Sequence, residues 1–516
     1  MILNRTQYLN KVAGCWMGKN IGGTLGAPFE WRRQVNQVSF YTQDLQGEPL
    51  PNDDLDIQLL WLVALEEQGV DIDAHLLSEY WLLYVTPHWA EYGNAKVNLR
   101  AGLLPPLSGT FNNPYQDSCG AFIRSEIWAC IAPGCPQQAA RYAYQDAIID
   151  HGRGEGAYAE VFTAALESAA FIVQDIPALV EIALSYLPAT CAVAGAVRLV
   201  QDCYQRKQTW LEARNQVLEQ FRGSAFQNNP ETVAAEDRAR GFDQGKFGWD
   251  VPSNIGMLLI GLLYGEGDFT KTLTTAVNCG EDTDCTAATA GSIFGILYGL
   301  DAIPERWKAP IGRKIKTACL NLGELGYFGN QLPADIDRLT DRTEQLAGQV
   351  IDRFHLPVTL SDSPTDLDGL QAASLYAGAL LEALYSSPNG PLYRFDFFDV
   401  SVDYGDSPEI CDNTPKTITL TVTNKYKTQA TLRLRWLAPE DWTITPGREG
   451  QFFIYVGRVD ANPRKLTFTL QVPHLSGGLV RLAVELTVDS RPQVMLAPIT
   501  LVNGNIRPEP DFHTLQ

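Results

Sequence analysis

The sequence predicts a large all-α domain followed by a small antiparallel β-sandwich of immunoglobulin-like type. Apolar residues recur three or four positions apart from residue 5 to about 385, whereas apolar and polar residues alternate after about residue 390. The length of 516 residues also exceeds what one ordinary hydrophobic core accommodates. We therefore expect a compact helical domain over residues 1–388 and a β domain over residues 389–516, separated near the turn-rich stretch SSPNGP (386–391).

The helical pattern is clearest in DIQLLWLVALEEQG (56–69), YAEVFTAALESAAFIV (158–173) and TEQLAGQVIDRF (343–354). Small residues are common in two other runs, GKNIGGTLGA (18–27) and AATAGSIFGILYG (287–299). Gly and Ala on a helix face let two backbones approach closely, which favours a compact bundle with a site between its helices.

The strand pattern appears in TITLTVTNKY (417–426), ATLRLRWL (430–437), KLTFTLQV (465–472) and LVRLAVELTV (479–488). Several such segments separated by turn residues are typical of an antiparallel sandwich. We expect Trp442 to pack in the core of this sandwich, with sugar binding as the alternative. For the β domain as a whole we expect a structural role or a role in forming a homodimer.

The charge and the apolar segments limit the possible functions. A formal net charge of −20 and a pI of about 4.8 argue against wholesale nucleic-acid binding, because such a protein repels the phosphate backbone. The N-terminus lacks the basic start and continuous apolar run of a signal peptide. The most apolar stretch, IGMLLIGLLYG (255–265), is too short to cross a bilayer. We expect a cytoplasmic protein with no membrane partner.

Acidic residues gather at two predicted helix starts. NCGEDTDC (278–285) contains Glu281, Asp282 and Asp284, and PNDDLD (51–56) contains Asn52, Asp53, Asp54 and Asp56. Helix capping is the ordinary explanation, since Asp and Asn are favoured N-caps and acidic first turns complement the helix dipole. One cap needs only one oxygen, however, and additional carboxylates repel each other unless a cation or a proton lies between them.

Oxygen donors from distant helix ends suit a hard divalent cation. Mg²⁺ or Mn²⁺ fits, and a pair of ions could bind vicinal sugar hydroxyls and polarise a water. Zn²⁺ fits less well because no His or Cys pair lies at ligand spacing. Structural Ca²⁺ is the alternative, although no DxDxDG loop is present. Glu30 is a weaker third candidate, for which a surface acid is the ordinary explanation.

Several motifs resemble the ADP-ribosylglycohydrolase family, which includes the enzyme that reactivates ADP-ribosylated dinitrogenase reductase. The resemblance covers about residues 8–350, and the DTDC form of the last motif also resembles a bacterial subgroup of the family. It rests on GCWMGKNIGGTLGAPFE (14–30), NDD (52–54), SCGAFIRSEIWA (118–129), DHGRGEGAYAEVFTAALESAAF (150–171) and GEDTDCTAATAGSIFGILYG (280–299). It implies an all-α fold with a cleft that holds two Mg²⁺ ions, or sometimes Mn²⁺.

The resemblance also implies roles for individual residues. The positions that match metal ligands are Asn52, Asp53, Asp54, Asp282 and Asp284, with Cys285 directly after them. Glu30 matches a residue near the metals and the substrate, and we expect Glu30 and Asp54 to be catalytic. Gly120 and His151 match substrate-side positions. A simple turn at Gly120 and a hydrogen-bonded core histidine at His151 are the alternatives.

Two positions depart from the family pattern. Asn52 stands where Thr or Ser is usual, and its amide oxygen can still coordinate a cation. Cys285 follows the DTD motif where Thr is common, and a thiol is a poor partner for Mg²⁺.

The function that the resemblance implies is metal-dependent hydrolysis. The enzyme would cleave the C1″ glycosidic bond of ADP-ribosyl conjugates or a related ribosyl compound, with water activated at a binuclear magnesium site. Two alternatives stay open. One is a metal-independent glycosidase that uses two carboxylates, and the other is a catalytically silent relative that binds ADP-ribose or a nucleotide.

Overall fold

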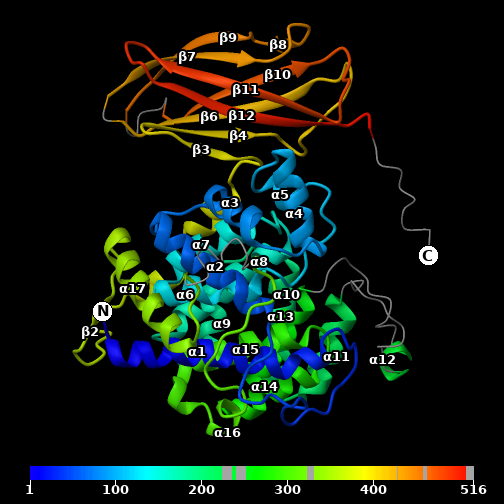
Figure 1. The fold of residues 1–516 in the computed structure, drawn as a ribbon, viewed down its shortest axis with the longest axis vertical. Coiled ribbons are helices and arrows are strands. Elements are labelled where there is room, and N and C mark those ends of the chain that lie inside the picture. Colours follow the sequence, from blue (N-terminus) through cyan, green and yellow to red (C-terminus); the bar gives the residue numbers. More distant parts are fainter. Residues whose placement is uncertain (223–234, 240–250, 322–330, 427, 457–461, 507–516) are drawn as a thin grey trace. The chain divides into compact units, whose positions relative to one another are not determined.

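The computed structural model describes residues 1–222, 235–239, 251–321, 331–426, 428–456 and 462–506 (Figure 1). The chain divides into two compact units. The helical unit comprises residues 1–96 and 112–385, and the β unit comprises residues 97–111 and 386–516. The second unit therefore includes a short segment from the middle of the helical part of the sequence.

The first part of the chain is helical, which confirms the predicted all-α domain. The helices are α1 (Arg5–Gly26), α2 (Asp53–Gln68), α3 (Ala74–Tyr84), α4 (Ala90–Ala101), α5 (Leu107–Thr110), α6 (Glu126–Ile131), α7 (Pro136–Ala147), α8 (Glu155–Ala170), α9 (Ile176–Leu184), α10 (Ala192–Gln205), α11 (Trp210–Phe221), α12 (Ala235–Ala239), α13 (Val251–Tyr264), α14 (Phe269–Asn278), α15 (Thr283–Tyr298), α16 (Glu305–Lys308), α17 (Ile336–Phe354) and α18 (Leu380–Tyr385). Among the described residues, no helix is both long and apolar enough to span a membrane.

Helices α1 and α15 pack against each other along their length and run in opposite directions (Figure 1). Small residues four positions apart form the contact. A Cβ atom on Gly18 would lie 2.0 Å from the carbonyl oxygen of Gly291, and one on Gly22 would lie 2.1 Å from that of Ala287. Only glycine allows so close an approach. This packing brings the C-terminal end of α1 to the N-terminal end of α15.

The described residues of the β unit form two five-stranded sheets that enclose one hydrophobic core, which confirms the predicted sandwich. The first sheet has the order β3 (Leu392–Arg394), β4 (Phe398–Asp403), β6 (Lys416–Asn424), β10 (Arg464–Gln471), β8 (Thr443–Thr445). The second has the order β5 (Glu409–Ile410), β12 (Val494–Asn503), β11 (Leu479–Val488), β7 (Ala430–Leu437), β9 (Glu449–Ile454). In the helical unit, β1 (Ile2–Asn4) pairs in parallel with β2 (Thr359–Ser361).

The core of the sandwich comes from alternating strand positions, from residues that flank the strands, and from one segment outside the C-terminal part of the chain. Strand β4 buries Phe398, Val400 and Val402 and leaves the residues between them partly exposed. Trp442 is also buried in this core, as the sequence predicts. The outside contribution comes from Leu103 and Leu107, each 1% exposed, which lie in the segment 97–111.

Candidate functional site

The loop after α1 is held beside the loop before α15. The N–H of Trp31 donates to the carbonyl oxygen of Glu281 at 2.9 Å, and Arg32 forms a β-bridge with the same residue. These contacts place Glu30 next to Asp282, although about 250 residues of chain separate them.

Capping accounts for only part of the acidic cluster at the start of α2. The side-chain oxygen of Asn52 accepts the N–H of Asp54 at 2.9 Å, so Asn52 is the cap. The Asn52 amide group also donates to the Asp54 carboxylate at 2.9 Å. Asp53 and Asp54 are therefore not needed as caps. The role of Asn52 as a metal ligand stays a prediction, since its oxygen is engaged by the helix here.

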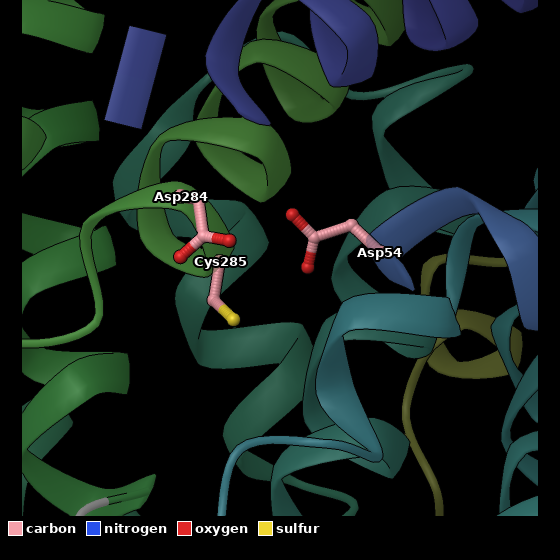
Figure 2. Close-up of side chains that lie close together, drawn as sticks. All are labelled: Asp54, Asp284 and Cys285. Carbon is pink, nitrogen blue, oxygen red and sulfur yellow. The ribbon is translucent and has the colours of Figure 1, made fainter. Parts of the chain in front are cut away.

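Capping also fails to explain the aspartates at the start of α15. Asp282 occupies the N-cap position, but its side chain makes no capping hydrogen bond. Its carboxylate lies instead with those of Glu30 and Asp284, with one oxygen of each within 4.8 Å of the others. Asp284 also belongs to a second group, in which single ligand atoms of Asp54, Asp284 and Cys285 lie within 4.8 Å of one another (Figure 2).

These acidic groups lie where water cannot compensate their repulsion. Asp54 and Asp282 are each 1% exposed, and one oxygen each of Asp54, Asp282 and Asp284 is buried without a hydrogen-bond partner. Burial and the neighbouring Asp284 raise the pKa of Asp282 well above its usual value. Burial raises the pKa of Asp54 to about 7, an effect that Asp53 and Glu126 reinforce and Lys19 opposes.

Glu30 and Cys285 complete the cluster. The side chain of Glu30 is exposed as a whole, but its carboxyl group faces Asp282 and Asp284. Desolvation of that group and the charges of Asp282, Asp53 and Asp54 raise the pKa of Glu30 to about 8. Cys285 is 7% exposed, and burial together with the nearby aspartates raises the pKa of its thiol well above the usual value.

Two other acids of the sequence clusters serve different purposes. Glu281 forms a buried ion pair with Arg222, and its carboxylate lies 3.5 Å from Nε of Arg33. Burial opposes ionisation of Glu281, but these arginines lower its pKa below the usual value. The carboxylate of Asp56 accepts the N–H groups of Ala318 and Cys319 at 2.6 and 2.5 Å. Both residues are thus structural.

The carboxylates line a pocket that contains about 560 Å³ of space, part of it open to solvent. Its walls include Glu30, Asp53, Asp282, Asp284 and Cys285, with Trp31, Trp89, Glu91, Tyr92, Ser118, Cys119, Gly120 and Ile123 around them. Trp89 is 56% exposed. Aromatic walls and a few converging polar groups are typical of a small-molecule site.

A comparison with known families decides the identity of this helical unit. The family model described as ADP-ribosylglycohydrolase matches residues 4–349, well over half of the chain. The chain belongs to the ADP-ribosylglycohydrolase family. Membership of this family makes the protein a glycohydrolase at the level of the family. The family as a whole acts on ADP-ribosyl substrates and is metal-dependent in general.

Two further comparisons add little to the family assignment. No relative matches among curated proteins. Among solved structures, a FixG-related protein from Vibrio parahaemolyticus is 17% identical and aligns over 21% of this chain and 99% of that chain, with a TM-score of 0.18. A likeness this weak carries no argument.

The residues present in this ADP-ribosylglycohydrolase fit a divalent cation. Carboxylate oxygens that are buried and lack a hydrogen-bond partner need a proton or a positive charge near them. Asp54, Asp282 and Asp284 offer such oxygens from two helix starts. Lys19 lies nearby but is occupied, because its Nζ donates to Glu126 at 2.7 Å and to Thr289 at 3.3 Å.

The predicted substrate-side residues have different positions. Gly120 lines the pocket, and a Cβ atom there would lie 2.1 Å from an oxygen of Glu91, so glycine makes room for that carboxylate. His151 is fully buried behind the pocket. Its Nε2 lies 3.0 Å from the hydroxyl of Ser118, which lines the pocket, and its Nδ1 lies 2.9 Å from Asp150.

A buried arginine fixes this part of the site. Arg124 donates to both oxygens of Asp150 at 2.7 and 3.0 Å, and its Nε donates to Asp146 at 2.9 Å. Burial alone would raise the pKa of Asp150, but Arg124 and His151 lower it below the usual value. The ionised Asp150 therefore lies beside the ring of His151 as a buried negative charge held by Arg124.

The sequence analysis missed the pocket wall contributed by the start of α4. Trp89, Glu91 and Tyr92 line the pocket, and the Tyr92 hydroxyl donates to Asp53 at 3.3 Å. The available signal was a cluster of aromatic residues around one acid in HWAEYG (88–93). Nothing in the local pattern connects this cluster with residues 282–285.

Proposed function

We propose that this protein is a metal-dependent glycohydrolase that cleaves the C1″ glycosidic bond of an ADP-ribosyl conjugate or a related ribosyl compound. Membership of the ADP-ribosylglycohydrolase family supports the reaction class. The observation that carries the metal dependence is the convergence of Asp54, Asp282 and Asp284, each with a buried oxygen that lacks a hydrogen-bond partner.

The ligand set that we propose is Asp53, Asp54, Asp282 and Asp284, assisted by Asn52 and Cys285. A pair of ions, with Mg²⁺ as the expected species and Mn²⁺ as a substitute, would supply Lewis acidity and orient vicinal hydroxyls of the sugar. Tyr92 would hold Asp53 in position through its hydroxyl hydrogen bond.

The other residues of the pocket would bind the substrate and move the proton. Glu30 faces the cluster from the exposed rim, so its carboxyl group can exchange a proton both with the reacting water and with solvent. Asp54 is the second candidate for this step. The exposed ring of Trp89 offers an apolar face for a base or a leaving group. Gly120 and Glu91 would shape the wall opposite the acids.

Chelation tests the proposal directly. We expect a chelator to abolish hydrolysis of ADP-ribosyl-arginine or ADP-ribosyl-serine peptides, and added Mg²⁺ or Mn²⁺ to restore it. The double variant Asp282→Asn with Asp284→Asn should be inactive while still folded by circular dichroism. Turnover that persists in chelator with a bell-shaped pH profile would instead favour the two-carboxylate glycosidase. Tight binding of ADP-ribose in calorimetry without product release would favour a silent relative.

A further inference from the structure

The acidic cluster contains two donor sets of different chemistry. Glu30, Asp282 and Asp284 offer only carboxylate oxygens, whereas Asp54, Asp284 and Cys285 offer two carboxylates and a sulfur. Asp284 belongs to both sets, which therefore lie side by side. We propose that the set containing Cys285 binds a borderline transition-metal dication such as Zn²⁺ or Co²⁺, while the all-oxygen set binds Mg²⁺.

The donor atoms of the sulfur-containing set lie close enough together that small side-chain movements would bring all three to one ion. Ligand atoms that surround a zinc-like ion at about 2.0–2.3 Å can lie at most about 4.6 Å from each other. The three ligand atoms of Asp54, Asp284 and Cys285 lie within 4.8 Å of one another. In Figure 2 the carboxyl groups of Asp54 and Asp284 face each other from α2 and α15, with Cys285 on the side of α15.

Burial without partners provides independent support for a cation at this position. One oxygen of Asp54 and one of Asp284 are buried and lack hydrogen-bond partners, and both residues are no more than 5% exposed. A cation between these oxygens would remove the cost of burying them. The acids alone do not distinguish one divalent ion from another.

The sulfur provides that distinction. Mg²⁺ prefers oxygen ligands and gives up its water reluctantly, whereas Zn²⁺ and Co²⁺ bind thiolates strongly. When the metal–sulfur bond forms, the thiol of Cys285 releases its proton to solvent. A hydroxyl at this position would not discriminate in the same way. The inference rests on the metal-dependent function proposed above, and it changes one assignment there, because a sulfur-binding ion would occupy one of the two positions proposed for Mg²⁺.

Optical spectroscopy of the full-length protein tests the inference without an activity measurement. The protein is stripped with a chelator under reducing conditions and then titrated with Co²⁺ in the presence of Mg²⁺. We expect a sulfur-to-cobalt charge-transfer band that saturates at one equivalent. Cys285→Ser and Cys285→Thr should lose the band. Their affinity for Co²⁺ relative to Mg²⁺ should fall by about 10- to 100-fold, a range that is typical even when a residue that only supports a metal ligand is replaced.

Two cysteine variants serve as controls. Cys411→Ser, in the β unit, should leave the band unchanged, and so should Cys119→Ser, although Cys119 also lines the pocket. A band that survives in both Cys285 variants, a band lost in Cys119→Ser, or one equivalent of bound Co²⁺ without any band would overturn the inference. Chelator-sensitive hydrolysis without the band would refute the inference alone, whereas the band without hydrolysis would refute the proposed function alone.

Discussion

A methyl group added to the contact between α1 and α15 should disturb the carboxylate cluster at one end of that contact. In Gly18→Ala, the new Cβ atom would lie 2.0 Å from the carbonyl oxygen of Gly291 and 2.3 Å from its carbonyl carbon. An ordinary carbon contact is about 3.5 Å, so the two backbones would have to separate by about 1.5 Å. The obstacle is backbone inside a helix, which cannot rotate away as a side chain can.

The expected cost lies at the upper end of the range for overpacked cores, about 3 kcal/mol of unfolding free energy. A fall in Tm of about 3–6 °C should follow for a unit of this size. Separation of the helices would also move Glu30 relative to Asp282, and metal sites tolerate ligand displacements of only about 0.2 Å. We therefore expect a loss of affinity for divalent cations at a site that Gly18 does not touch.

Thermal unfolding and a calorimetric metal titration measure both effects. Gly348→Ala is the matched control, because this residue also lies within a helix, α17, and a Cβ atom there would meet nothing within 4 Å. The control should gain about 0.5–1 kcal/mol from the higher helix propensity of alanine. If Gly18→Ala melts at or above the wild-type temperature and binds metal equally well, the close packing of α1 and α15 does not position the cluster.

Three further predictions concern the buried charges. In chelator, Asp282→Asn should have a higher Tm than the wild type, because it removes one of several repelling carboxylates. In saturating metal its Tm should be lower than that of the wild type, because the variant binds the metal less tightly. A Tm below the wild-type value in both conditions would contradict the argument. Since the pKa values of Glu30 and Asp54 are raised to about 8 and about 7, the folded metal-free protein binds more protons than the unfolded chain. Its Tm should fall as the pH rises from about 4 to 8, and excess Mg²⁺ should flatten that slope. Arg124→Met should cost about 3–5 kcal/mol in chemical denaturation, because it leaves Asp150 buried without its main counter-charge, and a loss below about 1 kcal/mol would refute that reading.

Local patterns were sufficient to predict the two kinds of architecture. The spacing of apolar residues indicated the helices, and alternation in segments such as β6 indicated the sandwich, because each pattern records burial on one face of its own element. The glycines of α1 and α15 also indicated close helix packing before any partner was known. The particular pairing, Gly18 with Gly291 for example, depends on tertiary register and has no local signal.

The candidate site was predictable only in part for the same reason. An excess of acids over capping needs singled out residues 52–56 and 281–284, and the structure brings members of both groups together. The excess of acids could not show which of them would bind other partners and lie outside the cluster. Glu281 pairs with Arg222, a partner 59 residues away, and Asp56 binds backbone 262 residues away. Such partners are determined by the tertiary fold, so the neighbouring sequence contains no signal for them.

The segment 97–111 limits how this protein can be divided in the laboratory. A fragment that ends at residue 385 would keep Leu103 and Leu107 but lose the strands that cover them, and two leucines would become exposed to water. Leaving a leucine exposed forfeits about 1.5–3 kcal/mol of burial and invites aggregation. A truncated catalytic fragment should therefore be insoluble unless both leucines are also replaced. Homologous chains that lack the β unit would need polar residues at these two positions.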